Sequence, residues 1–139
     1  MNAIQILKEA DLSPKVLNDD SLYIATVRKG ISGKAVKAIA KSSQDKDLLI
    51  KLLETSKSNL SRFYTKELLS PLVSESILDL LKVFHFAVEV FEDLVQAETW
   101  MHTSIPALNG EIPIELCDTS AGRKLVKDAL LAIEYGEFC

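Results

Sequence analysis

Glycine, proline and cysteine are all scarce in this chain of 139 residues, which has five glycines, four prolines and two cysteines. So few turn-forming residues disfavour an all-β protein, which needs many tight turns. The two cysteines, Cys117 and Cys139, are too few for a disulfide framework, so we expect free thiols. The first residues lack the features of a secretory signal, and no uncharged run approaches the roughly 18 residues of a membrane span. We therefore expect a cytoplasmic protein with no membrane partner.

Residues arranged for catalysis or metal binding are also scarce. The two histidines, His85 and His102, are far apart in the sequence, and neither has a second ligand at a spacing typical of metal sites. The chain has no glycine-rich phosphate loop and no Gly-x-Ser-x-Gly motif. We expect His85 to be packed in a core or an interface, and Cys117 to be a small buried side chain. The sequence thus predicts no catalytic residues, no metal ligands and no cofactor, which makes a small helical enzyme the least favoured class.

The residues that are abundant favour helix. Hydrophobic residues make up 47% of the chain and charged residues 26%, as in an ordinary globular domain. Apolar residues recur at helical spacing, so the expected fold class is all-α. Helices are expected at about 22–29, 33–41, 44–53, 57–65, 71–91, 94–101, 113–116 and 119–134. The predicted caps and stops of these helices are Ser32, Ser56, Ser70 and Asp93 at amino-terminal ends, and Gly30 and Gly136 at carboxy-terminal ends.

Charge is distributed unevenly along the chain, whose net charge is −4. Residues 1–27 carry a net charge of −2, residues 28–66 carry +7, and residues 67–139 carry −9. A basic block inside an acidic protein suggests a local site for a polyanion, because lysine and arginine release counterions when they bind phosphates. A solvated helical surface explains the same block equally well.

The predicted helix 71–91 has more apolar positions than one core contact requires. One line of apolar residues runs from Ile77 to Phe91, and a second line widens the face through Val83, Phe86 or Ala87, Val90 and Leu94. The surplus fits either deeper burial inside the protein or a seam between two copies. Burial is the simpler explanation.

Two predicted helices with a short break between them lie inside the basic segment. Residues 47–53, the break Glu54-Thr55-Ser56 and residues 57–65 have the proportions of a helix-turn-helix motif, whose second helix enters the major groove of DNA. The exposed side of that second helix combines phosphate-binding groups with groups able to contact base edges. The predicted DNA-binding residues are Lys57, Ser58, Asn59, Ser61, Arg62, Thr65 and Lys66.

Glu54 departs from the helix-turn-helix pattern. A glycine usually stands at this position, because it takes the left-handed backbone conformation without strain. A glutamate therefore predicts a non-standard turn, and its negative charge opposes contact with DNA. The alternative to DNA binding is a helical hairpin that keeps the fold without the contact.

The carboxy-terminal third contains a long ordered motif of unusual composition. It comprises Trp100-Met101, Pro106-Ala107-Leu108-Asn109-Gly110, Pro113-Ile114-Glu115-Leu116, Asp118-Thr119, Gly122 and a closing Ile133-Glu134-Tyr135-Gly136-Glu137-Phe138. This motif resembles the toxin-binding domain of the Xre/MbcA/ParS antitoxins, which pair with RES-domain toxins in bacterial type II toxin–antitoxin systems. Residues 28–32 and 60–62 are more loosely similar to the Xre-like helix-turn-helix half of that family. Where family members usually carry asparagine before Pro106, this chain has Ile105.

The resemblance implies an antitoxin whose partners are a cognate RES-domain toxin, operator DNA and a second copy of itself, in a homodimer and a higher toxin–antitoxin complex. It implies that the carboxy-terminal region covers the cleft through which NAD⁺ enters the toxin, and that the antitoxin represses its own operon. Gly136 would release a short tail from the last helix, with aromatic anchors of the kind that dominate interfaces. The predicted toxin-binding residues are Glu134, Tyr135, Gly136, Glu137, Phe138 and Cys139. Structural roles are expected instead for Trp100, Leu116, Asp118 and Gly122, as a core aromatic, a core leucine, a helix cap and a tight helix contact.

These inferences divide the chain into four parts. Residues 1–27 are an N-terminal extension, 28–68 a helix-turn-helix DNA-binding-like domain, 69–95 a long connecting or dimerisation helix, and 96–139 the toxin-binding domain. The expected architecture is an Xre-like helix-turn-helix bundle followed by a small helical toxin-binding domain. The alternative function is that of a helix-turn-helix transcriptional regulator without a toxin partner.

Overall fold

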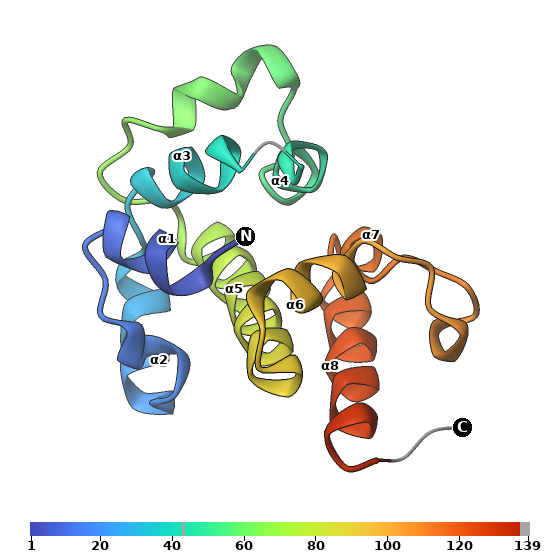
Figure 1. The fold of residues 1–139 in the computed structure, drawn as a ribbon. Helices are drawn as coiled ribbons and strands as arrows, with labels where there is room; N and C mark the ends of the chain where they lie inside the picture. The colour runs from blue at the N-terminus through green and yellow to red at the C-terminus, as the bar shows by residue number, and fades with distance from the viewer. Residues whose placement is uncertain (43, 137–139) are drawn as a thin grey trace.

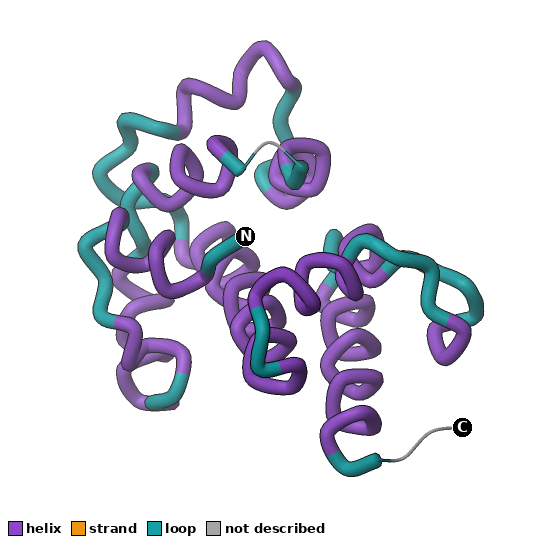
Figure 2. Tube along the Cα trace, in the orientation of Figure 1, coloured by secondary structure: helices purple, strands orange, loops and turns teal. Residues whose placement is uncertain are grey.

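The structure, a computed structural model, describes residues 1–42 and 44–136. Within these ranges every regular element is helical and no strand is present, which confirms the all-α prediction (Figure 2). In chain order the α-helices and the 3₁₀ helices (η) are α1 (Ala3–Glu9), η1 (Pro14–Leu17), α2 (Asp20–Lys29), α3 (Lys34–Lys41), α4 (Lys46–Leu52), η2 (Lys57–Phe63), α5 (Pro71–Phe91), α6 (Leu94–Met101), η3 (Pro106–Leu108), α7 (Pro113–Leu116) and α8 (Ser120–Glu134).

Side-chain caps define the starts of the three helices that dominate the carboxy-terminal half. The Ser70 hydroxyl accepts a hydrogen bond from Val73 N (3.2 Å) at the start of α5, and Asp93 accepts one from Val95 N (2.8 Å) at the start of α6. Both caps are as predicted. At the start of α8 the Thr119 hydroxyl accepts from Gly122 N (2.9 Å), whereas Asp118, predicted as a cap, is exposed and is not the capping residue. These caps satisfy backbone donors that the first turn of a helix leaves unpaired.

Helix α5 runs through the middle of the fold, and α1, α2, α4, α6 and α8 all pack against it (Figure 1). On its main apolar line Ile77, Leu81 and Phe84 are fully buried, while Val88 and Phe91 are partly buried. Val83 and Ala87 on the second line are also fully buried. Other helices of the same chain therefore cover most of this face, whereas Val88, Val90 and Phe91 are partly buried and Leu94 is 39% exposed, so a seam between two copies stays a prediction. None of the helices in the described ranges has the length and apolar character needed to cross a bilayer.

The first 27 residues, expected as an extension, contribute to the same core. Helix α1 packs against α3 and α5, and its residues Ile6 and Leu7 are buried. In η1, Val16 is buried as well. Neither element is predicted from the sequence, because α1 has seven residues and η1 has four, too few for a helical period to be recognisable.

Backbone contacts close the region between α2 and α5 into a unit. Gly33 N donates to Lys66 O (2.9 Å), and Leu69 N donates to Ile31 O (2.7 Å). Ile31 N donates to the buried hydroxyl of Ser74, on α5, at 2.9 Å. These bonds join the segment before α3 to the segment after η2. The predicted helix-turn-helix domain, residues 28–68, is therefore held against α5 at its two ends.

The predicted α-helix over 57–65 is a 3₁₀ helix, η2, over Lys57–Phe63. The sequence supplies a reason for this difference, because Ser56, Ser58, Asn59 and Ser61 have side chains that compete with the helical backbone for hydrogen bonds. The Ser56 and Ser58 hydroxyls bond each other at 3.2 Å. A 3₁₀ helix rises about 2.0 Å per residue instead of about 1.5 Å, and side chains three positions apart are aligned.

Candidate functional site

Helix α8 ends at Glu134, and the chain then turns at a glycine, as predicted. Tyr135 N and Gly136 N donate the last hydrogen bonds of the helix, to Leu131 O (3.0 Å) and Ile133 O (3.1 Å). Gly136 has a φ of +70°, a left-handed conformation that favours glycine. Glu134, Tyr135 and Gly136 are all exposed, and the Tyr135 side chain is 71% exposed. The other three predicted toxin-binding residues, Glu137, Phe138 and Cys139, lie outside the described residues.

Helix α8 is fixed to α5 by ionic contacts from one carboxylate. Asp79 on α5 accepts hydrogen bonds from Arg123 Nε (2.6 Å) and Lys127 Nζ (2.5 Å) on α8, and Arg123 also donates to Cys117 O (2.9 Å). Burial of Asp79 by itself would raise the pKa of this carboxyl, but the hydrogen bonds from Lys127 and Arg123 lower it overall. Arg123 is buried, so its charge depends on this carboxylate for compensation. This contact sets the direction in which the exposed end of α8 points.

The loop between α6 and α7 is closed by its own hydrogen bonds. Ile105 N donates to Glu111 O (3.0 Å), Gly110 N donates to Ile105 O (3.0 Å), and the Ser104 hydroxyl donates to Gly110 O (2.5 Å). Asn109 takes the left-handed conformation with a φ of +57°, which asparagine tolerates better than most residues. The loop therefore has a defined shape even though it carries few helical residues.

Helix α6 exposes an apolar surface that the sequence analysis missed. Phe91, at the end of α5, and Trp100 lie with their ring centroids 5.9 Å apart. Trp100 is partly buried against the core, consistent with its expected structural role, while Val95 on the same helix is 71% exposed. The sequence of α6 could have indicated this exposed surface. Leu94 and Val95 are apolar, but they come before the two positions of the helix that are buried, Ala97 and Met101.

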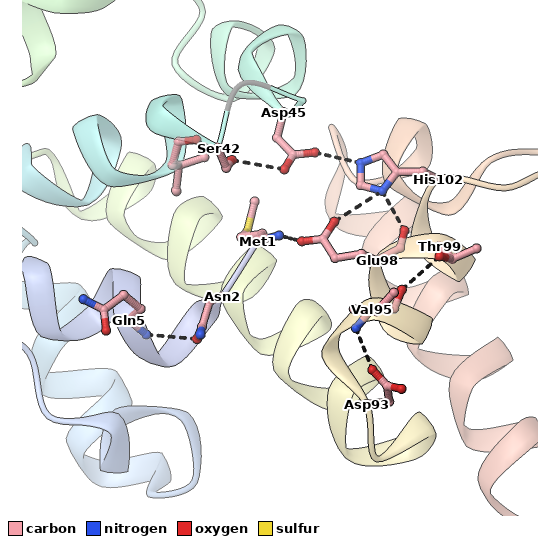
Figure 3. A network of polar contacts seen from close by, with 11 residues as sticks. Met1, Asn2, Gln5, Ser42, Asp45, Asp93, Val95, Glu98, Thr99 and His102 are labelled. Carbon is pink, nitrogen blue, oxygen red and sulfur yellow. Dashed lines mark hydrogen bonds and ion pairs between the residues drawn. The ribbon is translucent and has the colours of Figure 1, made fainter.

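His102, at the end of α6, connects the two halves of the chain. Its Nδ1 lies 2.8 Å from Glu98 O, and its Nε2 lies 3.0 Å from Oδ1 of Asp45, just before α4 (Figure 3). Asp45 is only 2% exposed, and its other oxygen accepts a bond from the Ser42 hydroxyl at 3.4 Å. The Glu98 carboxylate also forms an ion pair with the Met1 amino group. Sequence spacing could not reveal this contact, since His102 and Asp45 are 57 positions apart.

The predicted DNA-binding residues form an exposed surface on η2 and the turn after it. All seven are exposed, while Leu60 is buried and Phe63 and Tyr64 are partly buried behind them. The alignment in a 3₁₀ helix places Asn59 and Arg62 in one row. Among the ion pairs of the described residues, none involves Lys57, Arg62 or Lys66. All seven predicted residues are thus exposed within one segment of the chain, residues 57–66.

The turn between α4 and η2 has the left-handed conformation usual for this motif, so the prediction of a non-standard turn is wrong. Glu54 has a φ of +50°. Glu54 N donates to Lys51 O (3.2 Å) and Thr55 N donates to Ile50 O (3.1 Å), which is the hydrogen-bond pattern of a Schellman motif. A glutamate occupies the position that usually has glycine, and these two bonds stabilise its left-handed backbone.

The described residues contain no group of three or more side chains that could hold a metal ion. A comparison with curated proteins found no match. A comparison with protein families matches residues 86–136 to the antitoxin Xre/MbcA/ParS C-terminal toxin-binding domain, a family that is typically non-enzymatic. The matched residues begin inside α5, include α6, the closed loop, α7 and α8, and end at Gly136. Residues 86–136 therefore form a toxin-binding domain of the Xre/MbcA/ParS antitoxin type.

Proposed function

We propose that this antitoxin neutralises a RES-type toxin that consumes NAD⁺, and that it does so by covering the cleft through which NAD⁺ enters. The observation that supports this proposal is the exposed end of the toxin-binding domain. Tyr135 is 71% exposed where α8 ends, and Gly136 turns the chain away from the helix. An exposed aromatic residue at the end of a rigid helix is suited to entering a concave partner. The acidic character of residues 67–139, with a net charge of −9, complements a basic site that binds the phosphates of NAD⁺.

The tail proposal predicts that neutralisation depends on residues 134–139 while folding does not. Removal of Glu137, Phe138 and Cys139, or the substitution Tyr135→Ala, is expected to weaken toxin binding by at least about thirtyfold, corresponding to about 2 kcal/mol. The melting temperature of the free antitoxin should stay the same, because chain ends contribute little to a core. Growth of cells that also express the toxin, and calorimetric titration of the toxin, measure the effect. Leu72→Ala is the control, because Leu72 is 77% exposed and lies outside residues 86–136; full rescue by the truncated protein would contradict the proposal.

We also propose that the antitoxin represses its own operon, through a homodimer in which two copies of η2 contact the operator. The exposed cations on η2 and the left-handed turn at Glu54 support this role. A dimer would bind two half-sites about 34–36 Å apart, one turn of the double helix. The complex of this antitoxin with its toxin would present the same η2 surface to DNA.

DNA binding through η2 predicts a specific dependence on salt. The substitutions Lys57→Ala and Arg62→Ala should each weaken operator binding and reduce the slope of log affinity against log salt by about one unit, since each removes a phosphate contact. Electrophoretic mobility shifts of the promoter DNA at several salt concentrations measure this slope, for the antitoxin alone and with toxin. Lys8→Ala is the control, because Lys8 is an exposed lysine on α1. Unchanged slopes for both η2 variants would show that the hairpin is a scaffold without DNA contact.

A further inference from the structure

An apolar groove lies beside α6, within the toxin-binding domain. It has a volume of about 360 Å³ and is lined by residues that include Phe91, Val95, Thr99, Trp100, Thr103 and Ile105. All of these residues fall inside the matched range 86–136. We call this surface the α6 groove.

The chemistry of the α6 groove is that of a site for an uncharged, apolar group. None of its lining residues is charged. The Thr99 hydroxyl donates to Val95 O (2.9 Å) and the Thr103 hydroxyl donates to Thr99 O (2.5 Å). Because backbone carbonyls already engage both hydroxyls, the neutral carboxamide of Gln96 is the polar group left on a lining that is otherwise apolar. The tilted rings of Phe91 and Trp100 supply an aromatic wall.

The α6 groove is also rigid. Asp93 caps α6 through Val95 N, and the opposite side of the helix is anchored by Ala97 and Met101, both fully buried. Ile105, which also lines the groove, is held by backbone hydrogen bonds from its N to Glu111 O and from Gly110 N to its O. A site whose walls are fixed before binding loses little conformational entropy on association.

We infer that the α6 groove receives an apolar side chain, a leucine or a phenylalanine, from the surface of the cognate toxin. Toxin is the occupant that the domain match indicates, because residues 86–136 are a toxin-binding domain and the groove is built wholly from them. Burial of the exposed Val95 and of the aromatic wall would remove apolar area from water, and such central aromatic contacts carry a large share of interface energy. This contact rests on the proposed binding of the toxin, and it is a second anchor besides the tail at residues 134–139.

The test compares toxin binding by Val95→Asp and by wild-type antitoxin, as full-length chains titrated with purified cognate toxin in a calorimeter. Val95 is the second residue of α6, so an acidic side chain there interacts favourably with the helix dipole and should not disturb folding. We expect the dissociation constant of the toxin complex to rise at least thirtyfold, while Val95→Leu, which keeps the surface apolar, should retain wild-type affinity. Leu72→Asp, which makes the same kind of change at a 77% exposed position outside the domain, should have no effect. Circular dichroism of each variant confirms that it is folded.

The outcomes separate the groove from the broader proposal. If the wild-type antitoxin does not bind the toxin, the proposed function itself is wrong. If the wild-type protein binds and Val95→Asp binds equally well, the assignment of the α6 groove to the toxin is wrong. If Val95→Asp turns a dimer into a monomer in sedimentation experiments without changing toxin affinity, the occupant is a second copy of this chain, which also overturns the inference.

Discussion

The thiol of Cys117 shows how burial changes the chemistry of a single residue. Cys117 follows α7, is fully buried, and its Sγ lies 3.4 Å from Pro113 O. Burial raises the pKa of this thiol to about 12, far above the ordinary value of 9.0. Its predicted role as a small buried side chain is confirmed.

The raised pKa predicts that Cys117 is inert in the folded protein. In a Cys139→Ser variant, which leaves Cys117 as the single thiol, reaction with a thiol reagent such as DTNB at pH 8 should be negligible until urea unfolds the chain, since the thiolate is the reactive form. The thiol should also make stability fall between about pH 9 and pH 12, because there the unfolded thiol has lost its proton while the folded one keeps it. Absorbance of the released thiolate follows the reaction. A fast reaction under native conditions would show that Cys117 is accessible or ionised.

At the scale of elements, α7 and α8 approach each other closely at Gly122. A Cβ atom at this position would lie 1.6 Å from Leu116 O, a backbone atom that cannot move independently of α7. The glycine is therefore required by packing, in agreement with the tight helix contact expected for it. Helix propensity alone would favour alanine here by about 1 kcal/mol.

Gly122→Ala therefore tests whether packing or helix propensity controls this position. We expect the substitution to reduce the free energy of unfolding by about 1–3 kcal/mol, the usual cost of forcing extra volume into a packed site. Urea denaturation followed by circular dichroism measures the change. Ser120→Ala, at an exposed position of the same helix, serves as the control and should have a small effect. A gain in stability from Gly122→Ala would mean that α7 can move away at little cost.

At the scale of elements, η2 is a 3₁₀ helix where an α-helix was predicted. Of the apolar positions of this segment, Leu60 is buried and Phe63 is partly buried. Both a 3₁₀ and an α-helical path satisfy that pattern over one or two turns, so apolar spacing does not distinguish them. The serines and asparagine between these positions favour the 3₁₀ path locally.

At the scale of the whole molecule, the contact between His102 and Asp45 joins the end of α6, in the toxin-binding domain, to the residue before α4. Asp45 is almost completely buried. Its carboxylate lies 3.0 Å from His102 Nε2 and 3.4 Å from the Ser42 hydroxyl, so the contact with His102 is the shorter of the two. A buried carboxylate that loses a hydrogen-bond partner retains the cost of its desolvation.

His102→Leu is expected to reduce the free energy of unfolding by about 1.5–3 kcal/mol, the range for a hydrogen bond to a charged group. Asp45→Ala and the double variant complete a thermodynamic cycle, measured by urea denaturation, which should give a coupling free energy of at least about 0.5 kcal/mol. His85→Leu is the control, because His85 is a partly exposed histidine whose recorded ion pair is with Glu89, on its own helix. Additive effects of the two substitutions would show that the junction does not depend on this pair.

The sequence by itself determined the features that depend on neighbouring residues: the all-helical class, the capped helices at Pro71–Phe91 and Leu94–Met101, and the left-handed stop at Gly136. Caps, helical periodicity and glycine act within a few positions, so they can be recognised without a fold. Only the tertiary structure decided that α1 belongs to the core and that the α6 groove exists. These features depend on contacts between residues far apart in the chain, such as Asp45 and His102, whose free energy is gained only after the helices have packed.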